Sequence, residues 1–193
     1  MVDAHDSKSC LARGEGSSPS SGTSRNKVEI REGEIAVLWC VVQKFFMKIT
    51  LCGSIAFIDE MLEVKNDLEA MGHEVKLPLP EIFDQNGNTL SIKDFDANRK
   101  EVKADDAWVW EEKAKAIHAH FDKVVWSDAI LVLNYNKNNI SGYVGANTLM
   151  EMGLAFHLHK KIFLLKPVPQ ISYQEEILGM HPIVINDDLS LVL

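Results

Sequence analysis

The chain is poor in cysteine, and its few cysteines form none of the common functional patterns. Its 193 residues contain three of them, Cys10, Cys40 and Cys52, and no CxxC pair. The odd number and the wide spacing argue against a disulfide framework and against a structural zinc site. We therefore expect a cytoplasmic protein, kept in a reducing compartment, with no bound metal.

Long apolar runs and the common cofactor motifs are lacking as well. The longest apolar run is 35–42, whereas a helix needs about 18 apolar residues to span a bilayer. The chain opens with Asp3, His5 and Asp6, which does not fit a signal peptide. Neither G-x-x-x-x-G-K-[ST] nor G-x-G-x-x-G occurs, so nucleoside triphosphate hydrolysis and classical NAD binding lose their main support. We expect no cofactor.

The chain also has no excess of basic residues. The formal net charge is −8, from 20 basic and 28 acidic side chains. Residues 1–46 hold six of each sign, so the whole excess falls on residues 47–193. Such a surface repels the backbone of a nucleic-acid polymer. A small anionic ligand is compatible with it, because a few backbone N–H groups can hold a phosphate locally.

The composition changes near Met47. Residues 14–24 read GEGSSPSSGTS, which is too polar to build a core, while a strand-like segment begins at Met47. We predict that 1–46 is an N-terminal extension, largely disordered or a non-native start, and that 47–193 is one domain. The alternative is an arm that docks its apolar stretch, 35–46, on that domain.

From Met47 onward, apolar runs typical of buried strands alternate with helical patterns. The expected strands are 48–52, 73–77, 129–133, 162–165 and 183–185, and the expected helices are 57–71, 105–126, 147–159 and 173–178. Residues 81–104 are polar, contain the turn sequence DQNGN, and are expected to form an extended insertion. This alternation predicts an α/β fold, a flavodoxin/Rossmann-like doubly wound five-stranded parallel sheet of order 2-1-3-4-5.

In such sheets the ligand binds beyond the carboxyl ends of the strands, at the switch point. The turn after the first strand and the loop 134–148 would flank that crevice. Two glycines and an Asn-Thr pair that lead into the helix 147–159 would aim free N–H groups at the ligand. An ordinary tight turn is the alternative for the first segment. The substrate-binding candidates are Gly53, Ser54, Ile55, Gly145, Asn147 and Thr148.

Two carboxylates are candidates for catalysis. Glu151 follows the helix start by about one turn and stands between Met150 and Met152. A carboxylate among apolar neighbours near a helix N-terminus is unusual in a purely structural helix, although an ordinary surface glutamate is the alternative. Asp122 shares a predicted helix face with His118 at i, i+4. For Asp122 the alternative is a solvated helix charge.

The segment NTLMEMGLA (147–155) resembles the catalytic helix of the nucleoside 2-deoxyribosyltransferase superfamily, whose usual form is G-T-x-x-E-x-G-x-A. The segment CGSI (52–55) is similar to the opening of the branch that hydrolyses 2′-deoxynucleoside 5′-monophosphates. An Asp-bearing helix before the strand and ILVLN (130–134) match the family too. The resemblance implies that Glu151 is the nucleophile, Asp122 the helper near the base, and Ser54 a wall of the nucleotide pocket.

The resemblance further implies a hydrolase or transferase that cleaves or transfers the N-glycosidic bond of a (deoxy)nucleoside or nucleoside 5′-monophosphate with retention. It also implies a homodimer, for which Trp108 and Trp110 offer an apolar patch. Two features depart from the family. Asn147 and Leu149 replace glycines of the phosphohydrolase branch, and Thr50 stands where members often carry Tyr. Thr50 favours the alternative reading, a non-catalytic nucleotide-binding or sensing module of the same fold.

Overall fold

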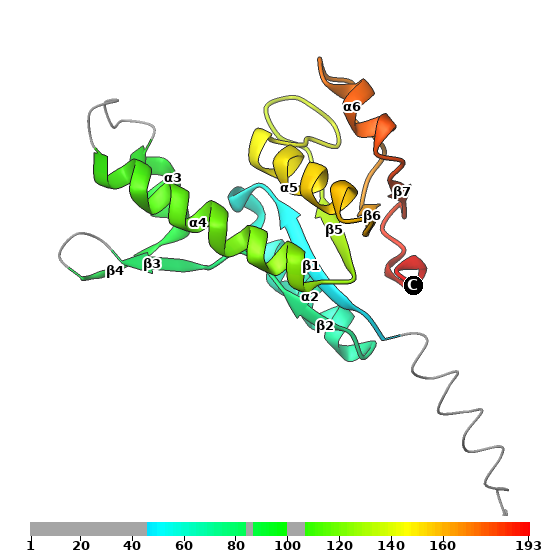
Figure 1. The fold of residues 1–193 in the computed structure, drawn as a ribbon, viewed down its shortest axis with the longest axis horizontal. Coiled ribbons are helices and arrows are strands. Elements are labelled where there is room, and N and C mark those ends of the chain that lie inside the picture. Colours follow the sequence, from blue (N-terminus) through cyan, green and yellow to red (C-terminus); the bar gives the residue numbers. More distant parts are fainter. Residues whose placement is uncertain (1–45, 84–86, 100–106) are drawn as a thin grey trace, which may run out of the picture.

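The computed structural model describes residues 46–83, 87–99 and 107–193 (Figure 1). Apart from Phe46, the predicted N-terminal extension lies outside the described residues, so the division of the chain at 46/47 stays a prediction. Within the described part of the chain, no helix is both long and apolar enough to span a membrane.

The centre of the fold is a five-stranded sheet in which every pair of neighbouring strands is parallel. Its strands are β1 (Lys48–Gly53), β2 (Glu74–Lys76), β5 (Ala129–Leu133), β6 (Lys161–Leu164) and β7 (Ile183–Val184). They lie in the order β2-β1-β5-β6-β7. Counted among themselves along the chain, they run 2-1-3-4-5, the order expected from the sequence. The labels differ because two further strands form a separate hairpin.

Helices cover both faces of the sheet, as the buried residues of β5 make clear. All five residues of β5 are buried. Ala129, Leu131 and Leu133 belong to one core cluster and Ile130 and Val132 to the other, as expected when successive side chains of a strand point to opposite faces. The first cluster includes residues of α2 (Ile58–Ala70) and Val109 at the start of α4 (Ala107–Trp126). The second includes Val124 near the end of α4 and residues of α5 (Ala146–His157) and α6 (Gln174–Gly179).

The segment 81–104 was expected to be an extended insertion, and this prediction is wrong. Its described part contains an antiparallel hairpin, β3 (Glu81–Phe83) with β4 (Thr89–Ser91), followed by α3 (Ile92–Arg99). The hydroxyl of Ser91 accepts a hydrogen bond from the backbone N–H of Asp94, the usual N-cap arrangement. Ile92 and Phe95 are buried on the inner side of α3. Figure 1 shows this unit beside the N-terminal half of α4, projecting from the sheet.

The switch point of the sheet lies between β1 and β5. Gly53 at the end of β1 pairs with Leu133 at the end of β5, so the loops after the two strands start side by side. A side chain at Gly53 would bring its Cβ to 3.0 Å from the carbonyl oxygen of Leu133. The glycine therefore permits this close approach of the two strand ends. The crevice that the sequence predicts would lie at this edge of the sheet.

Candidate functional site

A pocket of about 1050 Å³ opens at the switch point. Its walls come from the turn after β1, the loop after β5, the first turn of α5 and one side of α4, and from the segment after β2 together with β3 and α3. The structure brings to it seven of the eight residues predicted from the sequence. These are Gly53, Ser54, Ile55, Gly145, Asn147, Thr148 and Glu151.

The outer part of the pocket carries positive charge and free backbone donors. The Nζ atom of Lys137 donates a hydrogen bond of 2.6 Å to Oγ of Ser54 and lies 5.8 Å from the ring centre of Tyr143. Gly145 is the N-cap of α5 and has no side chain with which to cap the helix. The first N–H groups of α5 and the positive end of its dipole are thus available to an anion.

The inner end of the pocket holds Glu151. Its side chain is buried, with 8% of the residue exposed. Oε2 of Glu151 lies 3.6 Å from Nε2 of His120 on α4, and the same nitrogen lies 3.6 Å from Sγ of Cys52 on β1. Among the described residues, neither Oε2 of Glu151 nor Nδ1 of His120 has a hydrogen-bond partner.

Burial determines the protonation states of the three side chains at the inner end of the pocket, Glu151, His120 and Cys52. It raises the pKa of Glu151 to about 8, although Cys52 and Lys113 act in the opposite direction. Burial, assisted by the charge of Lys123, lowers the pKa of His120 to about 4. Burial and the nearby carboxyl group raise the pKa of the Cys52 thiol. Near neutral pH, the three side chains are therefore a carboxylic acid, a neutral imidazole and a thiol.

Asp122 is the predicted catalytic residue that the structure does not bring to the pocket. It is exposed on α4 and does not line the cavity. The side of α4 that faces the pocket carries Lys113, Ala116, His120 and Lys123, at helical spacings of three or four. Successive residues of an α-helix are rotated by about 100°, so Asp122 lies about 200° around the helix from His120. Asp122 was expected to be the helper near the base, but the α4 residue that the structure places beside Glu151 is His120.

Thr50, the departure on the first strand, also lies away from the pocket. It is fully buried, and its hydroxyl donates a hydrogen bond of 2.7 Å to the backbone carbonyl of Lys123. Thr50 therefore joins β1 to α4 and is not among the residues that line the cavity.

Comparisons with known proteins add little to this geometry. No protein-family model matches the chain, and no curated protein matches it. Among solved structures, it is similar to the CMP N-glycosidase BcmB of Clostridium botulinum, with 17% identity and a TM-score of 0.37. The match covers 72% of this chain and 88% of that one. A similarity at this level identifies neither the family nor the activity of the chain.

Sequence reasoning missed two members of the inner group, Cys52 and His120. A helical signal for His120 was present, because it falls in the stripe of Val109, Ala116 and Val124 that faces inward. Val109 and Val124 are almost fully buried. Cys52 alternates with the buried Leu51 at the end of β1, so its side chain points to the α4–α5 face. The side chains at the pocket could have been inferred from these two periodicities, but not their mutual distances.

Proposed function

We propose that the chain is an enzyme that cleaves or transfers the N-glycosidic bond of a (deoxy)nucleoside or nucleoside 5′-monophosphate, with Glu151 as the nucleophile. The observation that carries the proposal is the position of Glu151. It is a buried carboxyl group at the inner end of a pocket whose outer part presents Lys137, Ser54 and the start of α5. The family motif around Glu151 supports the same chemistry.

The proposed reaction requires the carboxylate form of Glu151. The imidazole of His120, 3.6 Å away, is the nearest base that could accept its proton. Attack of the carboxylate on the anomeric carbon would break the bond to the base and form a glycosyl ester. The departing base would take a proton from the imidazolium. Water or a second base would then displace Glu151, which gives retention of configuration.

Two features support a nucleotide over a nucleoside. The ammonium group of Lys137 lies 5.8 Å from the ring centre of Tyr143, and that ring lies against Gly145, the N-cap of α5, whereas Glu151 lies further along the helix. A 5′-phosphate bound there would receive a charge-assisted hydrogen bond and the helix dipole together. The sugar would then lie between the phosphate and Glu151. The proposal therefore favours a nucleoside 5′-monophosphate as substrate.

The test is base release from a panel of nucleosides and 5′-monophosphates, with the wild type and Glu151→Gln. Glutamine keeps the size of the side chain but loses the nucleophilic oxygen. We expect a folded variant that still binds substrate and whose kcat falls on the order of a thousandfold or more. Near-normal turnover in Glu151→Gln would refute the role of this carboxylate.

A second candidate is the non-catalytic nucleotide-binding module. The observation that favours it is the raised pKa of Glu151, about 8, since an un-ionised acid is a poor nucleophile near pH 7. The two functions separate in one series of assays between pH 6 and about pH 9. Tight binding of a nucleotide without base release at any pH would favour the module.

A further inference from the structure

Three different metal-ligating atoms converge at the inner end of the pocket. Sγ of Cys52, Nε2 of His120 and a carboxylate oxygen of Glu151 all lie within 4.8 Å of one another. They come from β1, α4 and α5, three elements far apart in the sequence. All three residues are more than nine-tenths buried. The core of the domain therefore holds the three side chains close together.

The spacing of these atoms matches that of ligands around one ion. In tetrahedral zinc sites, Zn–S bonds are about 2.3 Å, Zn–N bonds about 2.0–2.1 Å and Zn–O bonds about 2.0–2.2 Å. Ligand atoms at those bond lengths lie roughly 3.4–3.6 Å apart. The observed separations are 3.6 Å for Sγ to Nε2 and 3.6 Å for Nε2 to Oε2. The third separation, from Sγ to the carboxylate oxygen, is within 4.8 Å, so a small adjustment of the side chains would bring all three atoms to one metal ion.

The hydrogen bonding of the group is incomplete in a way that a metal would repair. Oε2 of Glu151 is a buried oxygen that has no hydrogen-bond partner among the described residues, and such groups are costly to bury. It faces Nε2 of His120 at 3.6 Å, which is longer than a hydrogen bond between nitrogen and oxygen. A cation between the two atoms would bind both of them.

We propose that Cys52, His120 and Glu151 bind one Zn²⁺ ion through Sγ, Nε2 and the carboxylate, with the fourth coordination position open to the pocket. The mixture of thiolate, imidazole and carboxylate suits zinc, whereas Mg²⁺ and Ca²⁺ prefer oxygen ligands. Binding releases the thiol proton and the carboxyl proton to solvent. The two resulting negative charges balance the charge of the ion, so the site as a whole stays neutral.

The site has a consequence that rests on the proposed function. A carboxylate bound to zinc shares its negative charge with the ion, so it is a weaker nucleophile and stabilises positive charge at the anomeric carbon less well. Zinc would therefore inhibit base release, and a chelator would restore it. Zinc binding and nucleophilic attack by Glu151 oppose each other. Zinc would therefore regulate the activity of the same pocket.

The first experiment measures binding of the metal alone to the full chain, without reference to activity. The chain, freed of metal by a chelator and dialysed, is titrated with Zn²⁺ against a chromophoric competitor and with Co²⁺ by absorption spectroscopy. We expect one equivalent of metal per chain and the charge-transfer band of a cobalt–thiolate bond. Cys52→Ala should abolish the band. His120→Ala should weaken zinc binding by more than about 100-fold, the upper end of the losses caused by mutating the partners of metal ligands.

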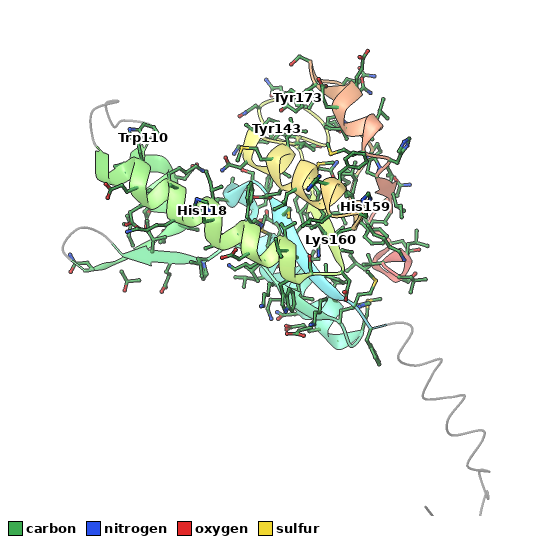
Figure 2. All side chains as sticks on the ribbon, viewed as in Figure 1. Trp110, His118, Tyr143, His159, Lys160 and Tyr173 are labelled. Atoms are coloured by element: carbon green, nitrogen blue, oxygen red, sulfur yellow. The ribbon has the colours of Figure 1, made fainter. Side chains whose placement is uncertain are left out.

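Matched variants separate this site from other thiols and histidines. The Cys10→Ala/Cys40→Ala variant removes the two other cysteines of the chain and should bind zinc like the wild type. His118→Ala removes an exposed histidine two residues before His120 on the same helix (Figure 2), and this variant should also bind zinc normally. If Cys52→Ala unfolds, Cys52→Ser serves in its place, with thermal unfolding as the readout. Zinc should raise Tm in the wild type but raise it much less in the serine variant.

The outcomes distinguish the two proposals. Absence of stoichiometric binding would overturn the metal site, as would a cobalt band that survives in Cys52→Ala and is lost in the Cys10/Cys40 variant. Base release that zinc does not affect would also overturn it. Stoichiometric zinc binding by a chain that releases no base even with chelator present would support the site and refute the glycosidase.

Discussion

Glu151→Gln should stabilise the fold at neutral pH, because the native structure keeps this carboxyl group neutral against its ordinary tendency to ionise. Its pKa is about 8 in the folded protein, compared with 4.5 as its ordinary value. Between these two values, unfolding lets the group release its proton to solvent, which favours the unfolded chain. The contribution of Glu151 to the stability of the wild type therefore falls as pH rises from about 4.5 to about 8. Glutamine does not titrate, so the variant lacks this loss.

The magnitude follows from linkage. Each pH unit above the unfolded pKa costs about 1.36 kcal/mol while the folded group stays protonated. At pH 7 the difference is 2.5 units, so Glu151 destabilises the wild type by about 3 kcal/mol. Near pH 4 the penalty vanishes, and the two proteins should have similar stability. The gain of the variant should therefore grow steadily from pH 4.5 to pH 7.

The assay is urea unfolding followed by tryptophan fluorescence at several pH values, with chelator present throughout. Subtracting the wild-type curve of unfolding free energy against pH from that of the variant removes the contribution of groups that titrate alike in both proteins. Glu63→Gln, at an exposed position of α2, controls for the loss of a surface charge. An equal or lower stability of Glu151→Gln at pH 7, with no trend in pH, would refute the assignment of a buried neutral acid.

Four further predictions follow from the pocket and the chain around it. Because the proposed reaction needs the one proton that Glu151 gives to His120 and His120 gives to the departing base, kcat/KM should be level from pH 6 to about pH 7 and fall about tenfold per pH unit above about pH 8; a rise in kcat/KM through pH 8 would contradict this. Lys137→Met should raise KM for a 5′-monophosphate roughly tenfold or more, the loss of a hydrogen bond to a charged group, and leave KM for the nucleoside nearly unchanged; an equal effect on both would remove the phosphate contact. A chain that begins at Met47 should keep its Tm, and a drop of more than about 5 °C would show that the apolar stretch 35–46 is docked. Light scattering should give a homodimer of twice 21.7 kDa, and a monomer across micromolar concentrations would refute the dimer.

The sheet could be predicted from the sequence because its signals are local. The run AILVL (129–133) is apolar at every position, as a strand covered on both faces must be, and it forms β5 with those bounds. The strand order follows from general rules for parallel sheets, and it places the pocket at the switch point. The hairpin and α3 were missed because their apolar residues, such as Ile92 and Phe95, are sparse within a polar segment. Only Ser91 and Asp94 marked the helix start.

The residues around Glu151 were harder to predict, because helix rotation is set by tertiary packing. Several rotations of α4 bury a comparable apolar stripe, and sequence reasoning placed Ile117, Val124 and Val125 together on one apolar face. In the structure Val124 is fully buried, whereas 54% of Val125 is exposed. That difference of one position rotates the helix by about 100°. It turns His120 toward Glu151 and leaves Asp122 outside.

The same packing explains why Glu151 can be both buried and reactive. A carboxylate isolated in a core would be driven to its neutral form and stay inert, but this one lies at the wall of a cavity that opens to solvent. The neighbouring imidazole is neutral for the same reason that the carboxyl is. A bound cation, or a substrate that develops positive charge at its sugar carbon, would stabilise the carboxylate and reverse this balance. In the free protein, Glu151 and His120 are thus both neutral. The ionised carboxylate is favoured only when a positively charged centre, either a metal ion or a transition state, lies beside it.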